Sequence, residues 1–572
     1  MKRLAFLFIF LMTILFWLRP MDDMNQDLGR HLKVGEIVAT TWQIPQTKLM
    51  AYTYPSYHAG NNPWLAEVVM YLLVQTIGVS GLYIFFILLF LFAFGLVLFS
   101  IRDKPIPVIL FVSCLVLGIM WERMSLRPEL FSYLFFSIFL VVLYANKKHF
   151  TKWIYILPFI EMLWVNMHIY FFLGIGLVGL FFIDACVTHW KSVVLFLKAK
   201  SSLPKKVTQL IILGVLIVIG ACINPSWVYG ALYPFLVLNG YYFPIGELSN
   251  TITLQFYSTF LTVIFFDILA ILSIILFFAY RKKIIFIDLL VALFVGFFGS
   301  LMIRNIVFFA FGMIIPFTHL LEHVYEKTKT NKSFQIILSS ISVLGMIFFL
   351  SFSINNVGFG FTVPAKAEKA VNFLIKNNVS GPLFNSFDIG SYLEYRFYPK
   401  QLVFVDTRPE AYPAVFFKNI YLPMQEDTKI FTQVDNQYHF NVIFYTFGEN
   451  VGFEDTFLSS IAHNPQFKLV YIDDYAIVFV RNTPQNQTVI KKYEITDTNF
   501  TPPAFTNAAN FLKLSNFFNY AGWGNAYTKT LQTILNHNPN YCPALYNLSQ
   551  VYSQQNLSIA PVYLSKYQQS CR

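Results

Sequence analysis

Residues 65–101 read LAEVVMYLLVQTIGVSGLYIFFILLFLFAFGLVLFSI, and no charged residue follows Glu67 until Arg102. A transmembrane helix needs about 20 consecutive apolar residues, so this stretch is long enough for one helix or for two. In a water-soluble protein, a helical run of this composition would present no polar face to the solvent. The stretch therefore predicts an integral membrane protein built from helices.

The remainder of the chain has the same character. Hydrophobic residues make up 56% of the 572 residues and charged residues only 12%, which excludes an ordinary soluble protein. The apolar run 4–18 follows Lys2-Arg3, and no small-residue cleavage site comes after it, which favours an uncleaved first span over a signal peptide. Further apolar runs cover about 106–121, 130–145, 153–167, 169–188, 209–223, 257–280, 284–302, 305–323 and 334–354. Several are shorter than a usual span, which predicts a tilted or irregular bundle.

The distribution of basic residues predicts how the chain crosses the membrane. The net charge is +11, but the basic residues cluster between apolar runs, where the positive-inside rule explains them without a nucleic-acid partner. With these clusters in the cytoplasm, the N-terminus is cytoplasmic, the chain after about 355 is outside, and the chain crosses about eleven times. This count requires one net crossing in 65–101, so we expect 64–78 to lie along the interface or to re-enter.

Under this topology, the unusual polar residues gather on the outer side of the membrane. A protein that only spans a bilayer does not need such a concentration, which favours a site at the extracytoplasmic surface. The polar residues of the outer loops include Asp27, His31, Glu122, Arg127, Asn166, His168, Asn224, Glu247 and Arg304.

The first outer loop, residues 19–64, is the richest of these segments. Asp27, His31 and Gly35 recur every four residues, so Asp27 and His31 share a face if the segment is helical. An Asp beside a His suits a general base, or one part of a metal or phosphate site. The alternative is a surface helix that Asp27 caps. In either interpretation, Gly35 permits a close turn or the end of the helix.

Short motifs in a fixed order resemble a known group of proteins. Asp27-Leu28 with His31-Leu32 and Gly35, a later Ile44-Pro45, then Tyr52-Thr53-Tyr54 and Trp64-Leu65-Ala66-Glu67 are similar to the opening of a bacterial multi-pass family related to the GT-C glycosyltransferases. Further similarities to that family are Arg127-Pro128-Glu129, Trp164-Val165-Asn166-Met167-His168, Asn224-Pro225, Arg304-Asn305, Asn385 with Asp388-Ile389-Gly390-Ser391-Tyr392-Leu393, and Val405-Asp406-Thr407-Arg408. The resemblance covers most of residues 1–415 and implies a GT-C-like membrane domain.

The resemblance implies transfer of a sugar from a polyprenyl-phosphate carrier to an unidentified glycan, lipid or protein acceptor outside the bacterial cytoplasmic membrane. Asp27 would be the general base beside His31, with Asp22 and Asp23 as reserves. Arg304 and Arg127 would hold the leaving phosphate, because a guanidinium pairs with two phosphate oxygens. Substrate-binding candidates are Arg304, Arg127, Asn166, His168, Glu67 and Glu247, although a solvated carboxylate is the default interpretation of Glu247.

Two departures from the family pattern bear on cofactors. Lys48 stands where the family usually has an acidic residue, and Pro63 where it has His or Glu, so we assign no metal ligand. A requirement for a divalent metal stays open. No phosphate-binding loop for a nucleotide is present in the sequence, which favours a lipid-linked donor and predicts no nucleotide cofactor.

Beyond the membrane domain, residues 1–354, the composition changes. Residues 365–498 predict an outer α/β domain with strands at 382–387, 401–406 and 440–446, helices at 389–397 and 454–463, and a hairpin of 468–472 with 475–481 that turns at Asp473-Asp474. Residues 505–572 predict a helical tail that resembles one tetratricopeptide-like helix pair. Cys542 and Cys571 could pair there if the tail is exported.

Two other classes of function remain open. A non-catalytic membrane scaffold could keep this fold and bind envelope partners through its tail, and the departures at Lys48 and Pro63 would fit a degenerate site. A transporter for a lipid-linked glycan would place polar residues at the middle of the membrane, where Asp184 and Asp267 are the candidates.

Overall fold

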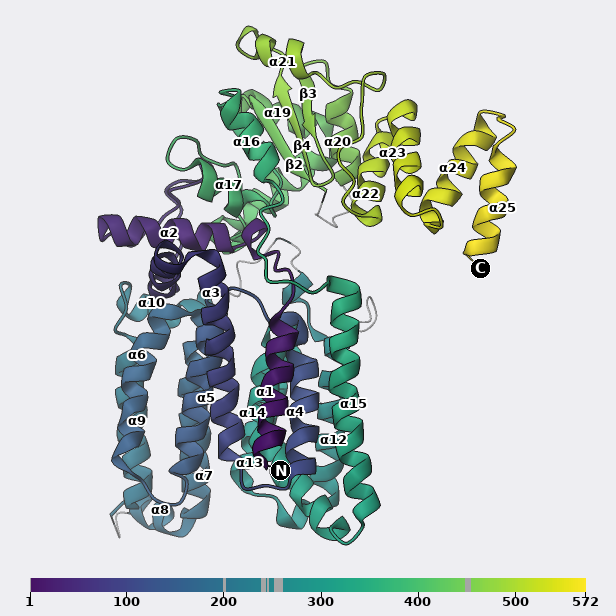
Figure 1. The fold of residues 1–572 in the computed structure, drawn as a ribbon. Coiled ribbons are helices and arrows are strands. Elements are labelled where there is room, and N and C mark those ends of the chain that lie inside the picture. The colour runs from purple at the N-terminus through teal and green to yellow at the C-terminus, as the bar shows by residue number, and fades with distance from the viewer. Residues whose placement is uncertain are drawn as a thin grey trace.

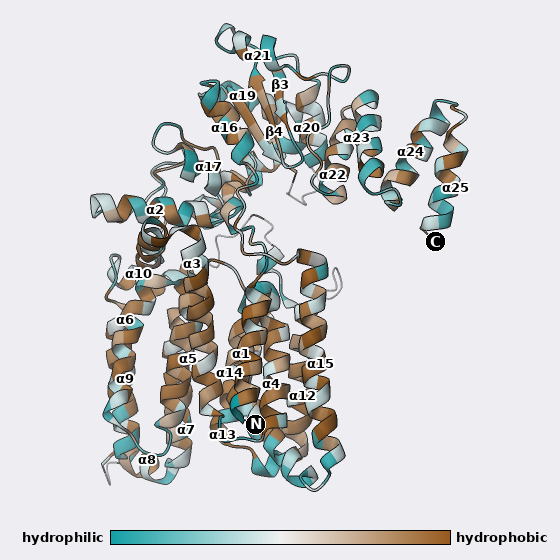
Figure 2. Ribbon diagram, in the orientation of Figure 1, coloured by the Kyte–Doolittle hydropathy of each residue, from teal (hydrophilic) through white to brown (hydrophobic). Residues whose placement is uncertain are grey.

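The computed structural model describes residues 2–198, 202–237, 243, 246–251, 261–447 and 454–571. Figure 1 shows a bundle of long helices below and an α/β domain above it, with a helical tail extending to one side. In Figure 2 the bundle is almost uniformly hydrophobic, and hydrophilic residues gather at its lower end and in the upper domain. The two parts are therefore a membrane domain and a domain outside the bilayer.

Helices account for the predicted apolar runs of the membrane domain. Within the described ranges, six helical stretches are long and apolar enough to cross a membrane: Trp64–Ser100, Ile106–Arg123, Ile169–Thr188, Leu261–Ala279, Ile303–Thr328 and Lys332–Asn355. The helices of the bundle are α1 (Lys2–Trp17), α3 (Trp64–Ser100), α4 (Ile106–Met120), α5 (Glu129–Ala145), α6 (Leu157–Met167), α7 (Phe172–Thr188), α9 (Lys205–Ala221), α12 (Leu261–Ala279), α13 (Phe286–Leu301), α14 (Ile306–Thr328) and α15 (Lys332–Val357). The chain is thus a multi-pass membrane protein, and the count of eleven crossings stays a prediction.

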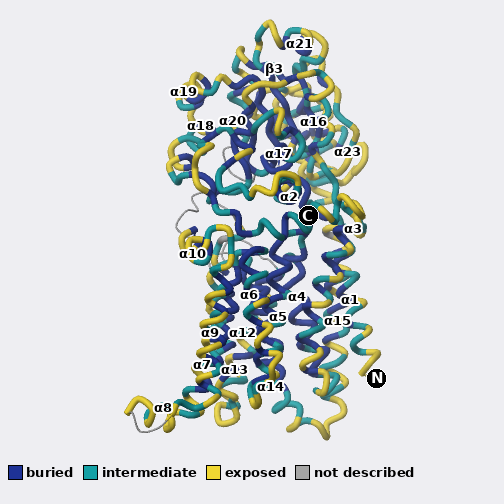
Figure 3. The backbone as a smooth tube through the Cα atoms, turned by 90° about the vertical axis from the view of Figure 1, so that its left-hand side faces the viewer, coloured by how far each residue is buried: buried dark blue, intermediate teal, exposed yellow. Residues whose placement is uncertain are grey.

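Side-chain burial follows what a lipid environment requires. Phe308, Phe311 and Phe136 are fully buried between the bundle helices, whereas Leu88 and Phe297 are 59% and 67% exposed on its outside. Figure 3 shows exposed segments of the bundle helices in yellow and buried segments in dark blue. Large apolar side chains on the outside of a helical bundle are stable when lipid chains cover them.

Helix α3 is divided at Gly78. The backbone there has φ 72° and ψ 176°, a conformation that glycine adopts without the strain a side chain would cause. Figure 1 shows the first part of α3 end-on beneath helix α2 (Leu28–Thr41) and the second part running along the bundle. The second part, residues 79–100, measures about 33 Å at 1.5 Å per residue, which is enough for one crossing. This arrangement supports the single crossing of 65–101 over the double one.

Gly35 does not end a helix, contrary to the sequence expectation. Helix α2 continues to Thr41, and a Cβ atom added at Gly35 would lie 2.1 Å from the main-chain oxygen of Glu67. The glycine is therefore needed because α2 crosses the start of α3 with their backbones almost in contact.

The upper domain is built on a four-stranded sheet. Its strands are β1 (Leu383–Asn385), β2 (Val442–Thr446), β3 (Phe467–Ile472) and β4 (Ala476–Arg481), in the order β1-β2-β4-β3. Only the pair β1 and β2 is parallel, and the other two pairs are antiparallel. The predicted hairpin of β3 and β4 is confirmed, since Asp473 accepts hydrogen bonds from the main-chain N–H groups of Tyr475 and Ala476 in its turn. The helices of this domain include α16 (Glu368–Lys376), α17 (Gly390–Phe397), α19 (Thr428–Tyr438), α20 (Glu454–Ala462) and α21 (Gln487–Tyr493).

The predicted strand at 401–406 is wrong, because this segment does not join the sheet. The main chain of Val403 pairs instead with the first outer loop: its N–H donates to Met50 and its carbonyl accepts from Tyr52, at 3.0 and 3.1 Å. The Thr53 hydroxyl also donates to the carbonyl of Phe404, at 2.5 Å. The segment is as buried as a central strand. Burial alone therefore could not show that its partner lies about 350 residues earlier.

The C-terminal tail contains four helices rather than one pair. They are α22 (Ala508–Tyr520), α23 (Gly524–His537), α24 (Cys542–Gln554) and α25 (Ala560–Ser570), and each packs against the next. A disulfide joins Cys542 and Cys571, so the pairing that the sequence left open is present. Helix α22 lies against α20 of the α/β domain, and the later helices extend away from it (Figure 1).

Candidate functional site

A cavity of about 570 Å³ lies between the membrane domain and the upper domain. Its lining comes from the first outer loop and the start of α2, from the loop that precedes α5, from the segments between α6 and α7 and between α13 and α14, and from residues around 246. The upper domain contributes residues 366, 387, 388, 407–410, 446, 447, 474 and 475, and α22 contributes Asn510 and Lys513. Segments from both domains that are far apart in the sequence thus enclose one space.

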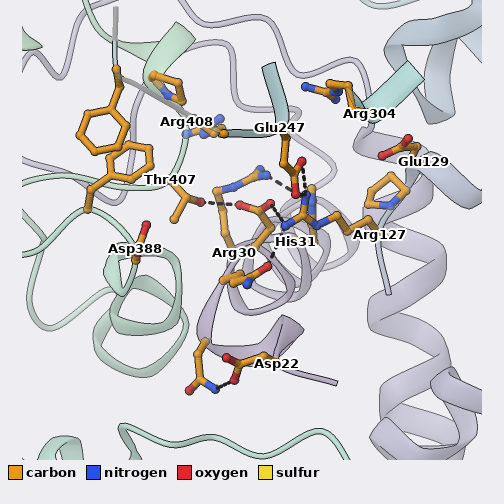
Figure 4. A pocket seen from close by; sticks show the side chains of 18 of the residues that line it. Asp22, Arg30, His31, Arg127, Glu129, Glu247, Arg304, Asp388, Thr407 and Arg408 are labelled. Atoms are coloured by element: carbon orange, nitrogen blue, oxygen red, sulfur yellow. Dashed lines mark hydrogen bonds and ion pairs between the residues drawn. The ribbon is translucent and has the colours of Figure 1, made fainter. Parts of the chain in front are cut away.

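The cavity brings together most of the candidates that the sequence proposed. Asp22, Asp27, His31, Arg127, His168, Glu247 and Arg304 all line it. Figure 4 shows Arg127, Glu247, His31 and Arg30 around one region of it, with Arg304 nearby and with Thr407, Arg408 and Asp388 facing them from the upper domain. The candidates Asp23, Glu67 and Asn166 do not line the cavity.

Asp27 stands at the N-terminal end of α2 but does not cap it. Its side chain makes no capping hydrogen bond and instead accepts one from the Thr407 hydroxyl at 2.5 Å, while Arg127 lies 3.4 Å from its other oxygen. Burial raises the pKa of Asp27, but Arg127, Arg30, His31 and this hydrogen bond together lower it more, so the pKa lies below its ordinary value. Asp27 is therefore ionised at neutral pH, as a proton acceptor must be.

Arg127 belongs to a network of ions on the membrane side of the cavity. Its guanidinium lies 3.1 Å from Glu247, and Arg123 lies 3.2 Å from Glu247 and 3.1 Å from Glu129. Burial raises the pKa of Glu247, but Arg127 and Arg123 lower it more, so this carboxylate stays ionised well below neutral pH. Glu247 is thus bound between two arginines and is not a simply solvated carboxylate.

His31 and Arg30 are held from behind by Glu67. This carboxylate is fully buried and accepts from Arg30 at 3.2 Å, from His31 Nδ1 at 2.8 Å and from Asn61 at 2.9 Å. Arg30 also lies 3.2 Å from His31 Nε2, and since arginine can only donate, Nε2 is the acceptor and Nδ1 carries the proton. Glu67 therefore positions two residues of the cavity without touching it.

The two reserve carboxylates face different surroundings. Asp23 is buried and accepts a hydrogen bond from the main-chain N–H of Leu126 at 2.8 Å, and burial raises its pKa. Asp22 lines the cavity, where its two oxygens accept from Asn25 at 2.6 Å and from Lys366 at 2.8 Å. Asp23 thus supports the loop beneath Arg127, and Asp22 is the reserve that could contact a ligand.

His168 and Asn166 are close in sequence but differ in their surroundings. The Ser132 hydroxyl lies 2.8 Å from His168 Nδ1 and accepts from Trp164 at 2.7 Å, so this hydroxyl links the two rings and fixes the orientation of the imidazole. Asn166 accepts from Trp64 and donates to the carbonyls of Met162 and Ile223, each at 2.8 Å. The Asn166 side chain therefore has structural partners at both ends.

Arg304 lies at the junction of α13 and α14, over the ring of Tyr170 at 5.5 Å from its centroid. The Tyr170 hydroxyl donates to Asn305 at 2.8 Å, which fixes the ring beneath the guanidinium. An arginine stacked in this way is held in place over a flat surface and can present N–H groups to an anion.

Several cavity residues were not among the sequence candidates. Arg30 lies directly before His31, and Asp388, Thr407 and Arg408 belong to motifs quoted above, so a signal existed for each. Arg408 forms an ion pair with Asp406 at 3.3 Å and also lines the cavity.

The two residues that depart from the family pattern, Lys48 and Pro63, lie at different sites in the structure. Pro63 lines the cavity just before α3, whereas Lys48 lies outside it, buried over the ring of Tyr412. Across the described ranges, no group of three or more His, Cys, Asp and Glu side chains is arranged to hold a metal ion.

Solved structures with a similar fold include glycosyltransferases of the GT-C class. The apo oligosaccharyltransferase of Archaeoglobus fulgidus matches with a TM-score of 0.52 and 10% identity, over 84% of this chain and 74% of that one. The archaeal oligosaccharyltransferase AglB from Archaeoglobus fulgidus, in complex with an inhibitory peptide and a dolichol-phosphate, matches with a TM-score of 0.53 and 9% identity, over 94% and 86%. The mycobacterial arabinofuranosyltransferase AftD matches with a TM-score of 0.51 and 9% identity, over 84% of this chain and 40% of that one.

Sequence comparisons add no closer relative. No protein-family model matches the sequence, and no curated protein matches it. The protein therefore has a GT-C-like fold, a membrane bundle joined to an outer mixed α/β region, and the likeness concerns the fold alone.

Proposed function

We propose that this protein transfers a sugar from a polyprenyl-phosphate carrier to an acceptor at the outer face of the bacterial cytoplasmic membrane. The observation that carries the proposal is the single cavity in which the ionised Asp27 lies beside Arg127, with Arg304 and His168 on the same lining. A proton acceptor and cations for a phosphate are the two requirements of this reaction. One protein of similar fold is described in complex with dolichol-phosphate, which is a polyprenyl-phosphate.

The donor phosphate would bind on the membrane side of the cavity. Arg304 and Arg127 would pair with its oxygens, and His168 would donate from Nε2. Arg127 already has two carboxylate partners, so part of its positive charge is compensated before a phosphate binds. These donors would stabilise the negative charge that develops on the leaving phosphate.

The transfer step would proceed with Asp27 as general base. A hydroxyl oxygen of the acceptor would form a bond to the anomeric carbon as the bond from that carbon to the phosphate oxygen breaks. The hydroxyl proton would move to Asp27, and the bonding electrons would remain on the polyprenyl phosphate. The Thr407 hydroxyl would orient Asp27 from the opposite domain.

Charge distribution supports an outward-facing cavity. The basic clusters at 102–104, 147–152 and 281–283 lie in loops at the lower end of the bundle, away from the cavity (Figure 2). Basic loops of membrane proteins remain in the cytoplasm, so the N-terminus would be cytoplasmic and the upper domain outside.

The test is release of polyprenyl phosphate from a panel of polyprenyl-phosphate sugars by the purified full-length protein. We expect Asp27→Asn to lower release about 100-fold, because the amide cannot accept the proton. Asp103→Asn is the matched control, since Asp103 is exposed at the opposite end of the bundle. Equal release by wild type and Asp27→Asn would assign the base elsewhere, with Asp22 as the next candidate.

The scaffold alternative is supported by one observation, the extension of α24 and α25 away from the rest of the protein (Figure 1). A surface of this kind suits a protein partner. The same assay separates the two functions. The scaffold would be favoured if the protein still binds polyprenyl phosphate but releases none from any donor sugar, even when an extract that contains acceptors is added.

A further inference from the structure

The cavity has a second end, formed by the upper domain and the tail. Asp388, Asp474 and Tyr475 line it from the α/β domain, and Asn510 and Lys513 line it from α22. These residues are remote from Arg127 and Arg304 in the sequence and belong to other elements. Helix α22 is therefore part of the wall of the cavity, and the tail is not only an attached module.

The charges at this end are already compensated. Lys366 lies 2.8 Å from Asp22 and over the ring of Tyr475, 5.6 Å from its centroid. Asn510 donates to Asp474 at 3.1 Å. This end carries the carboxylates of Asp22, Asp388 and Asp474 and the ammonium groups of Lys366 and Lys513, so it has no surplus positive charge with which to hold a second phosphate or another anion.

The polar groups that line this end suit hydroxyl groups of a ligand. A carboxylate accepts hydrogen bonds from hydroxyls, whereas an ammonium and an amide donate to them. Tyr475 adds an aromatic ring, a flat apolar surface against which the C–H face of a sugar can pack. An apolar acceptor would exclude water from the carboxylates of Asp388 and Asp474 and from the ammonium of Lys513, which is unfavourable.

We infer that this end of the cavity binds a saccharide acceptor, with Asn510 and Lys513 of α22 among its contacts. The inference rests on the proposed function and specifies its acceptor: an uncharged, hydroxyl-rich glycan rather than a peptide or a lipid. The acceptor would enter between α22 and the α/β domain, opposite the donor phosphate.

Asp388 occupies the place where the two ends meet. Figure 4 shows its carboxylate directed toward Thr407, the residue that holds Asp27. Burial and the negative charge of Asp27 raise the pKa of Asp388 to about 6, although Lys513 lowers it. Asp388 is thus placed to accept a hydrogen bond from an acceptor hydroxyl while Asp27 receives the reacting proton.

The inference is tested by saturation-transfer difference NMR on the full-length protein in lipid nanodiscs. The probes are methyl α-D-mannopyranoside, methyl β-D-galactopyranoside and methyl N-acetyl-β-D-glucosaminide, with a neutral threonine-containing tripeptide for comparison. We expect at least one glycoside to bind, and the double variant Asn510→Ala, Lys513→Ala to bind it roughly tenfold more weakly, as expected for two lost hydrogen bonds. Lys566→Ala, on the exposed face of α25, is the matched control.

Three results would overturn the inference: no binding of any glycoside, preferential binding of the tripeptide, or equal glycoside binding by the double variant and the control. Polyprenyl-phosphate binding is measured on the same samples and should be equal in all of them, because its site is at the other end. If glycosides bind but no donor is turned over, the proposed transferase function is refuted and the inferred saccharide-binding site stands. If the donor is turned over but no glycoside binds, the saccharide-binding site is refuted and the transferase function stands.

Discussion

Lys48 offers a quantitative test of how the first outer loop is joined to the upper domain. Its side chain is buried beneath the domain, over the ring of Tyr412, and its Nζ has no hydrogen-bond partner in the described part of the chain. Burial lowers the pKa of Lys48 from 10.5 to about 7, although the nearby Asp406 raises it. We predict that Lys48→Met stabilises the protein, because methionine has a similar length and carries no charge.

The size and the pH dependence of this gain follow from the pKa. One pKa unit corresponds to about 1.36 kcal/mol, so the difference between 10.5 and about 7 makes the charged lysine cost about 5 kcal/mol below pH 7. Between pH 7 and 10.5 the unfolded chain binds a proton that the folded protein does not, so wild-type stability rises with pH. At pH 9 the remaining cost is about 2 kcal/mol.

The assay is the melting temperature of the purified protein in detergent, followed by tryptophan fluorescence from pH 6 to pH 9. At about 2 °C per kcal/mol, we expect Lys48→Met to melt up to about 10 °C higher at pH 6 and about 4 °C higher at pH 9. Lys376→Met, at an exposed position of α16, is the control and should follow wild type at both pH values. A gain that does not decrease with pH, or a loss at pH 6, would refute the reasoning.

Three further predictions concern the framework of the site. Gly35→Ala should lower the melting temperature by the equivalent of about 1–3 kcal/mol, since the new methyl group meets the main chain of α3 at 2.1 Å; an unchanged melting temperature would contradict that close crossing. Glu67→Gln removes the carboxylate that pairs with the buried Arg30 and should cost about 3–5 kcal/mol, measured as lost thermal stability while donor binding persists; wild-type stability would mean that other carboxylates or water compensate the charge of Arg30. Replacing Cys542 and Cys571 by serine should cost the tail about 3–4 kcal/mol for a separation of 29 residues, measured as faster proteolysis of α24 and α25 alone; equal proteolysis would show that helix packing suffices.

The membrane helices could be predicted from sequence because lipid imposes one simple rule on them. Each apolar run became a helix, since a backbone in hydrocarbon must satisfy its own hydrogen bonds. The segment 401–406 could not be assigned in the same way. A buried apolar stretch reads as a strand whether its partner is the sheet or, as for Val403, a loop that precedes the bundle.

The candidate site was predictable on the membrane side and much less so on the other. Asp27, His31 and Arg304 were identified because polar residues beside apolar runs are rare and therefore informative. Asn510 and Lys513 gave no signal, because an Asn and a Lys on a surface helix are ordinary. Only the packing of α22 against the α/β domain brings them to the cavity.

The pairing of the first outer loop with residues 403 and 404 delays completion of the cavity, because the two segments are synthesised at different times. Thr53 and Phe404, which share a hydrogen bond, are separated by 351 residues. A ribosome that adds about 5–20 residues per second needs roughly 20–70 s to connect them. During that interval the membrane helices can insert, but Thr407 is not yet present to hold Asp27. The residues that the upper domain contributes to the cavity are also absent. A partly synthesised chain could thus bind lipid phosphates through its arginines, but it could not yet transfer a sugar. The incomplete protein is therefore inactive.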